Sequence, residues 1–320
     1  MLWVQFIGAC VIIVIAGRKL VFHANKFAKQ KGWGDVWAGF ILLAIATSLP
    51  ELFTATCSVT IIKLPDLALG NILGSIAFNL FIIAILDAVR GKGPILRETD
   101  TGLILCGGIS IILSSLTIAG MSSGVSFTIA GIGPFSIIIA LIYLLGARLI
   151  FRSQKKAVLN TRASSSGGSL LKYLLCALFI FGASIWLVHT AEGIAIQTGW
   201  GTTFVGALLL GIATSLPEAT TSIYAVRQGS FGMAIGNILG SNMLNVVIVP
   251  ICDIFTPGIN FLSAVSMNNI LPAAVGILMT AIVIVGIIYR SKKSFLRLGL
   301  DSIAIVIIFV VGSYLLFCMG

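Results

Sequence analysis

The stretch AIATSLPE at residues 44–51 recurs as GIATSLPE at residues 211–218, each time inside a long apolar segment whose interior carries no other acidic residue. Each copy is followed, at nearly the same distance, by GNILGS at residues 70–75 or 236–241, and then by Asn79 or Asn245. A charged side chain at the centre of a bilayer costs about 2.5–3.5 kcal/mol on insertion scales. Two matched copies of such a side chain indicate a function, and they divide the chain into two related halves.

The composition predicts a membrane protein, because 58% of the residues are hydrophobic and only 9% are charged, far from ordinary globular usage. A transmembrane helix needs about 20 apolar residues. On that basis the sequence predicts an all-α integral membrane protein with ten transmembrane helices. Their predicted bounds are residues 2–22, 35–62, 66–89, 101–120, 124–148, 172–197, 200–226, 229–256, 264–289 and 296–319.

The net charge of +10 comes from basic residues that gather on one side of the predicted membrane. All Lys and Arg residues except Lys63 lie in or beside the loops after the first, third, fifth, seventh and ninth helices. Basic loops face the cytoplasm, so we expect a multi-pass protein of the cell membrane with both termini extracellular or periplasmic. The charge is therefore an orientation signal in a protein whose partner is the lipid bilayer, and we expect no nucleic-acid partner.

The main break in the apolar pattern is the basic and Ser/Gly-rich stretch at residues 151–169. Its composition is typical of a flexible linker. We therefore expect a first five-helix repeat at residues 1–150, a cytoplasmic linker at 151–169 and a second repeat at 170–320. Five is an odd number of spans, so the second repeat enters the membrane inverted, an architecture of transporters whose site lies at the midplane between the repeats.

Each TSLPE copy carries oxygen-bearing side chains around a proline. Pro50 and Pro217 lack the N–H that would close a helical hydrogen bond, so the helix is expected to break there. One turn of helix then places Thr47 and Ser48 near Glu51, and the second copy supplies Thr214, Ser215 and Glu218. Ca²⁺ takes six to eight oxygen ligands, which two facing half-sites could supply. Without a cation the carboxylates should hold a proton or contact water, so proton coupling stays open.

The GNILGS segments add a polar stripe to each following helix. Asn71, Ser75 and Asn79 are spaced by four residues, and the second copy repeats this spacing with Asn237, Ser241 and Asn245. The GxxxG pairs within these segments permit close helix packing. Asp87 and Asp253 fall near the ends of the same helices, where we expect them to be solvated.

The paired TSLPE and GNILGS motifs resemble those of the prokaryotic-type sodium/calcium exchanger family of the cation/Ca²⁺ antiporters, over essentially the whole chain. The resemblance implies that Glu51 and Glu218 are the central ligands shared by transported Ca²⁺ and Na⁺. It also implies further oxygen ligands from Thr47, Ser48, Ser75, Thr214, Ser215 and Ser241, and from the carbonyls of Ala44 and Gly211. By the same resemblance Asn79 and Asn245 line the middle of the site.

The chain departs from this family in having Asn79 and Asn245 where members often carry Asp, which leaves two carboxylates in the core. The stoichiometry and the choice between Na⁺ and H⁺ as counter-ion therefore stay open, and a Ca²⁺/H⁺ antiporter and a passive cation channel are the alternatives. The sequence has no nucleotide-binding loop, no GxSxG and no His/Cys cluster. We therefore expect neither an enzyme nor an organic cofactor, and the oligomeric state, a monomer included, stays open.

Overall fold

A computed structural model describes residues 2–31, 38–91, 93–155, 169–198, 205–256, 258–291, 294–295 and 298–319. Within these residues nine helical segments are long and apolar enough to span a membrane. The tenth predicted span, residues 200–226, corresponds to a broken helical run over Val205–Arg227. Its predicted start at residue 200 falls within residues 199–204, which lie outside the described part. The prediction of an all-helical membrane fold is confirmed.

Both TSLPE segments form helices that break at a serine. In the first half the run consists of η1 (Gly39–Leu43), α3 (Ala44–Thr47), α4 (Leu49–Cys57) and η2 (Ser58–Ile62), and in the second of η4 (Val205–Leu210), α10 (Gly211–Thr214) and α11 (Leu216–Arg227). The helices are interrupted at Ser48 (φ −84°, ψ 2°) and Ser215 (φ −86°, ψ 4°). Each proline follows as the second residue of the next helix, where its missing N–H costs no hydrogen bond.

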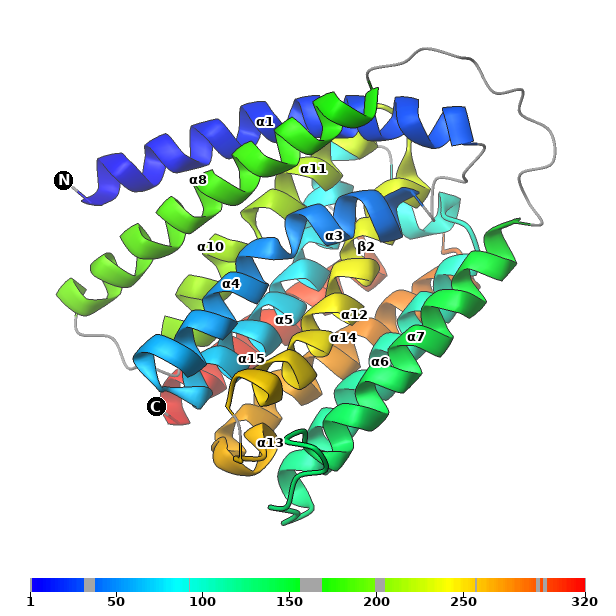
Figure 1. The fold of residues 1–320 in the computed structure, drawn as a ribbon. Helices are drawn as coiled ribbons and strands as arrows, with labels where there is room; N and C mark the ends of the chain where they lie inside the picture. Colours follow the sequence, from blue (N-terminus) through cyan, green and yellow to red (C-terminus); the bar gives the residue numbers. More distant parts are fainter. Residues whose placement is uncertain are drawn as a thin grey trace.

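The two GNILGS segments lie in α5 (Pro65–Arg90) and α12 (Phe231–Phe255), which run through the middle of the molecule (Figure 1). Their glycines let the broken helices approach closely. A Cβ atom on Gly74 would lie 2.0 Å from the Ala207 carbonyl oxygen, and one on Gly240 would lie 3.0 Å from Phe40 Cα. The broken helices therefore contact the backbone of α5 and α12 directly.

Four long helices cover one side of this centre: α6 (Gly102–Ser122), α7 (Pro134–Lys155), α14 (Ile270–Tyr289) and α15 (Leu300–Met319). Short segments lie in the connections that lead to them. They are η3 (Ile95–Glu98) between α5 and α6, α13 (Phe261–Ala264) and η5 (Met267–Asn269) between α12 and α14, and the antiparallel pair β1 (Ser294–Phe295) and β2 (Leu298–Gly299) between α14 and α15. The predicted helix at 124–148 begins only at Pro134, because residues 124–133 form a turn in which Ile129 pairs with Ile132.

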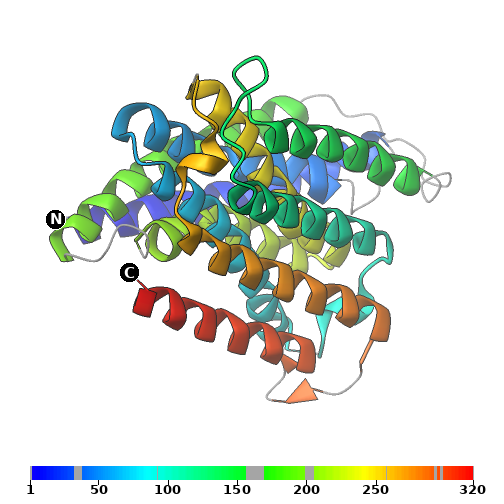
Figure 2. The ribbon, with the colours of Figure 1, turned by 90° about the horizontal axis from the view of Figure 1, so that it is seen from below.

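The remaining helices, α1 (Leu2–Lys31) and α8 (Ser169–Thr198), lie side by side along the outside of the molecule (Figures 1 and 2). The α1 helix continues to Lys31, beyond its predicted end at residue 22. It contacts α11 at Gly17, where a Cβ atom would lie 2.9 Å from Thr220 Cγ2. The hydroxyl of Tyr173 on α8 donates to the Leu42 carbonyl. This helix pair therefore covers both broken helices.

Asp87, at the end of α5, is buried, with 1% of its surface exposed. Its Oδ1 accepts a hydrogen bond from Ile95 N (2.7 Å), and its Oδ2 accepts from Gly299 N (3.0 Å) and Ser302 Oγ (2.7 Å). The prediction that this helix end is solvated is wrong, because two returning segments cover it and supply N–H donors.

Asp253 has the same role at the end of α12 and is fully buried. Its Oδ1 accepts from Phe261 N (2.7 Å), and its Oδ2 accepts from Gly133 N (3.2 Å). The expectation of solvation is therefore wrong in both halves. Each carboxylate thus links the end of a central helix, by hydrogen bonds, to two other segments. One is the segment that follows the helix in the sequence, and the other lies directly before an outer helix, α15 for Asp87 and α7 for Asp253.

Candidate cation site

The two helix breaks meet the polar stripes of α5 and α12 in the interior. The side chains of the predicted site residues are all buried, with at most 6% of any of them exposed: Thr47, Ser48, Glu51, Ser75, Asn79, Thr214, Ser215, Glu218, Ser241 and Asn245. The fold thus gathers side chains from four segments that are far apart in the sequence.

Each glutamate accepts a hydrogen bond from the serine at the opposite helix break. Ser48 Oγ donates to Glu218 Oε1 (3.4 Å), and Ser215 Oγ donates to Glu51 Oε1 (3.3 Å). Ser241 Oγ donates to the same Glu218 oxygen (3.2 Å). The two half-sites are therefore linked reciprocally, and the second carries one additional hydroxyl contact.

The threonines of the two breaks also make matching contacts across the repeats. Thr47 Oγ1 donates to Leu43 O (2.9 Å) within its own helix, and it lies 3.3 Å from Asn237 Oδ1 and 3.5 Å from Ser241 Oγ on α12. Thr214 repeats the pattern with the corresponding atoms Leu210 O (2.9 Å), Asn71 Oδ1 (3.3 Å) and Ser75 Oγ (3.1 Å). The break of each half therefore contacts the polar stripe of the other half.

The carbonyls of Ala44 and Gly211 lie one turn before the breaks. They accept hydrogen bonds from Ser48 N (3.0 Å) and Ser215 N (3.2 Å), respectively. The Gly211 carbonyl also accepts from Ser75 Oγ (3.4 Å). Thr214 Oγ1 lies 3.5 Å from the same oxygen. The two carbonyls therefore occupy matching places at the breaks, and hydroxyl groups lie close to the Gly211 oxygen.

The asparagines differ between the halves, and the difference involves Asn242, which the sequence reasoning missed. Asn79 Nδ2 donates to Asn242 Oδ1 (3.0 Å), and Asn242 Nδ2 donates to the Ile76 carbonyl (3.4 Å). Asn245 has no hydrogen-bond partner at either amide atom among the described residues. A signal for Asn242 was present, since this polar residue directly follows Ser241 inside the predicted span 229–256.

Several buried acceptor atoms in this region have no hydrogen-bond partner in the described part of the chain: Glu51 Oε2, Glu218 Oε2, Asn79 Oδ1 and Asn245 Oδ1. Buried polar atoms in folded proteins are nearly always hydrogen-bonded. Among the described residues no group of three or more His, Cys, Asp or Glu side chains comes together. The available ligands are therefore carboxylate, amide, hydroxyl and carbonyl oxygens, which suit hard cations.

Comparison with protein families gives a match to the family described as sodium/calcium exchanger protein, over residues 1–157 and 168–318. Among curated proteins, the inner membrane protein YrbG of Escherichia coli is 26% identical over 262 residues, which cover 77% of this chain and 78% of YrbG. The Ca(2+)/H(+) antiporter ChaA of Bacillus subtilis is 23% identical over 276 residues, which cover 79% of this chain and 76% of ChaA.

Among solved structures, the sodium-calcium exchanger NCX_Mj soaked with Na⁺ and Sr²⁺ superimposes with a TM-score of 0.72. The match covers 97% of this chain and 98% of the other, at 17% sequence identity. At that identity the match establishes the fold, which is that of an all-helical membrane exchanger.

Proposed function

Because this chain belongs to the sodium/calcium exchanger protein family, we propose that it moves Ca²⁺ across the cell membrane in exchange for Na⁺. The observation that carries this proposal is the reciprocal linkage of Glu51 and Glu218 through Ser215 and Ser48. Both carboxylates are fully buried, and each keeps one oxygen without a partner among the described residues. Two such groups from opposite halves suit one central site for a hard cation.

We assign the central ligand role to the carboxylates of Glu51 and Glu218. Further oxygens come from Thr47, Ser48, Ser75, Asn79, Thr214, Ser215, Ser241 and Asn245, and from the carbonyls of Ala44 and Gly211. The two carboxylates together balance the charge of one Ca²⁺ or of two Na⁺. Ca²⁺ and Na⁺ would then compete for the same oxygens, so that binding of one ion requires release of the other.

Exchange requires that the site open to one side of the membrane at a time. We place the moving part in α1 and α8, which lie together outside the core and contact both broken helices. In contrast, Asp87 and Asp253 fasten the ends of α5 and α12 to neighbouring segments. The helix pair would shift while the fastened core retains the ion.

The test is ⁴⁵Ca²⁺ uptake into proteoliposomes loaded with Na⁺ and diluted into Na⁺-free buffer, compared with an imposed pH gradient. We expect uptake driven by the Na⁺ gradient and lost in Glu51→Gln and in Glu218→Gln. Glu98→Gln, which changes a glutamate with an exposed side chain, is the matched control and should transport normally. Uptake that persists in both buried variants would contradict the assigned ligands.

Ca²⁺/H⁺ antiport is the second candidate, favoured by the similarity to ChaA and by the amides at Asn79 and Asn245. The same experiment separates the two, because a proton-coupled antiporter would take up Ca²⁺ only under the pH gradient. A passive channel would give Ca²⁺ flux without either gradient.

A further inference from the structure

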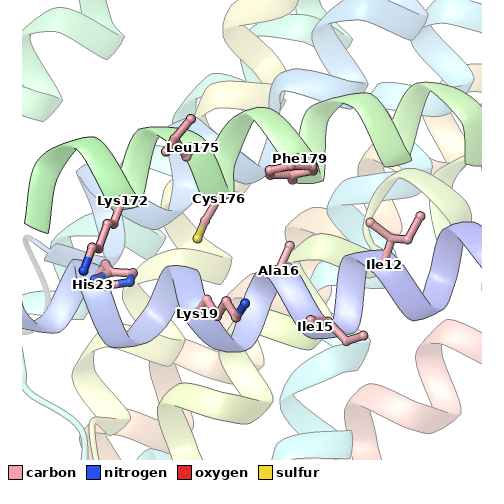
Figure 3. A pocket seen from close by; sticks show the side chains of 9 residues that line it. All are labelled: Ile12, Ile15, Ala16, Lys19, His23, Lys172, Leu175, Cys176 and Phe179. Carbon is pink, nitrogen blue, oxygen red and sulfur yellow. The ribbon is translucent and has the colours of Figure 1, made fainter.

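A groove of about 540 Å³ lies between α1 and α8, on the outside of the molecule (Figure 3). It is separate from the central polar cluster and shares none of its residues. The residues that line it are Ile12, Ile15, Ala16, Lys19, His23, Lys172, Leu175, Cys176 and Phe179. One part of this lining is apolar and the other is basic, so the groove has two chemically different ends.

The apolar end faces outward. Ile15, Leu175 and Phe179 have 55%, 47% and 65% of their surface exposed, whereas Ala16, with 8% exposed, lies deeper between the helices. These residues belong to helical segments that are long and apolar enough to span a membrane. In a bilayer such a surface contacts hydrocarbon, so this part of the groove has the shape and chemistry to hold an acyl chain.

The basic part of the lining carries two lysines from different helices. Lys19 and Lys172 are both exposed. Figure 3 shows Lys172 beside His23 at one end of the groove and Lys19 nearer its middle, across from Cys176. Neither lysine makes a hydrogen bond or ion pair within the described residues. The groove lining contains no acidic side chain, so its basic end is complementary to an anion.

From this geometry we propose that the groove binds one anionic phospholipid, with its headgroup at the part lined by Lys19 and Lys172 and a chain along Ile15 and Phe179. A soluble anion would make no contact with the apolar part of the groove. A zwitterionic lipid would place its own cationic group near the lysines, which would weaken their attraction to its phosphate. The positive-inside bias places this end at the cytoplasmic surface, where anionic headgroups attract Lys and Arg. One bound lipid would then join α1 to α8.

The proposal can be tested by native mass spectrometry of the full chain released from mild detergent after incubation with phosphatidylglycerol or phosphatidylcholine of identical chains. We expect the wild-type protein to retain one phosphatidylglycerol in preference to phosphatidylcholine. Lys19→Gln/Lys172→Gln should weaken that retention about tenfold or more, since each lysine near an anionic surface contributes about fivefold. Both side chains are exposed, so the fold should tolerate the change, which size-exclusion chromatography checks.

The matched control is Arg148→Gln/Arg152→Gln, which removes the same charge from exposed positions on α7 and should leave retention unchanged. Cys176→Phe fills the groove without changing charge, and it should also lower retention. Equal retention by the lysine variant and the wild type would overturn the proposal, as would equal loss in the arginine control. Full retention in Cys176→Phe, or displacement by soluble glycerol phosphate, would indicate a simple anion site and would equally refute a lipid groove. None of these outcomes depends on which ion the protein transports.

Discussion

Asn242 breaks the symmetry of an otherwise paired set of polar residues. Its amide lies between Asn79 Nδ2 and the Ile76 carbonyl, and Ile76 itself occupies the corresponding place in the first repeat. Asn242 accepts a hydrogen bond from the Asn79 nitrogen, and the Asn79 oxygen has no partner among the described residues. Asn242 therefore orients the Asn79 amide, which we assign to the ion site. Asn242 itself is not among the assigned ligands.

Asn242→Leu should lower both stability and Ca²⁺ affinity. It leaves Asn79 Nδ2 buried without an acceptor, which costs about 1–3 kcal/mol, and it frees the Asn79 amide to rotate. Thermal unfolding followed by size-exclusion chromatography, together with the Ca²⁺ dependence of ⁴⁵Ca²⁺ uptake, measures the two effects. The neighbouring buried change Met243→Leu keeps volume and polarity and should be nearly neutral. If Asn242→Leu behaves like Met243→Leu, the orienting role is wrong.

Ser48→Ala and Ser215→Ala should weaken Ca²⁺ binding by similar amounts. Each removes a hydroxyl that donates to the glutamate of the other half, at 3.4 and 3.3 Å. A hydrogen bond to a charged group contributes about 1.5–3 kcal/mol, so we expect at least about a tenfold rise in the Ca²⁺ concentration for half-maximal uptake.

Ser136→Ala is the control for these two variants, because Ser136 is buried and its hydroxyl has no partner among the described residues. It should leave the Ca²⁺ dependence unchanged. If only one of Ser48→Ala and Ser215→Ala strongly changed the Ca²⁺ dependence of uptake, the two serines would have different roles in Ca²⁺ binding despite their similar hydrogen bonds.

At the scale of the elements, the close contact between α5 and η4 predicts that Gly74→Ala is severely disruptive. The new Cβ would meet the backbone oxygen of Ala207 at 2.0 Å, and a backbone atom cannot move aside as a side chain can. We expect the variant to lose its folded peak in size-exclusion chromatography and to lose transport. Gly108→Ala on α6 is the matched control, because nothing lies within 4 Å of its added Cβ, so it should remain folded and active.

The elements also show how far the sequence determines the structure. The broken helices were predictable because Pro50 and Pro217 act locally, and their pairing was predictable because a duplicated motif implies duplicated contacts. Local sequence patterns gave wrong predictions where contacts with distant segments determine the structure. The burial of Asp87 depends on Gly299, far along the chain, and the apolar residues before Pro134 resemble helix although they form a turn. Asn242 was missed because it occurs in only one copy.

At the scale of the whole molecule, the distribution of basic residues predicts that the two ends of α7 lie on opposite sides of the membrane. In a cysteine-free background, Phe127→Cys, in the turn that leads into α7, should react from outside intact cells with a membrane-impermeant maleimide, since Phe127 is 61% exposed. Arg152→Cys, at the other end, should react only after permeabilisation. The reverse pattern would mean that the termini face the cytoplasm.

The reciprocal serine contacts also have a consequence for the order of events during synthesis. The one serine found to donate to the Glu51 carboxylate, Ser215, lies in the second half of the chain, so Glu51 enters the bilayer long before that donor has been translated. Until the second half is inserted, the Glu51 carboxyl group lacks this hydrogen-bond donor. During that time it must hold a proton or contact water. On the proposed assignment of Glu51 and Glu218 as ligands, ion affinity would be acquired only after the second half has been inserted and has docked.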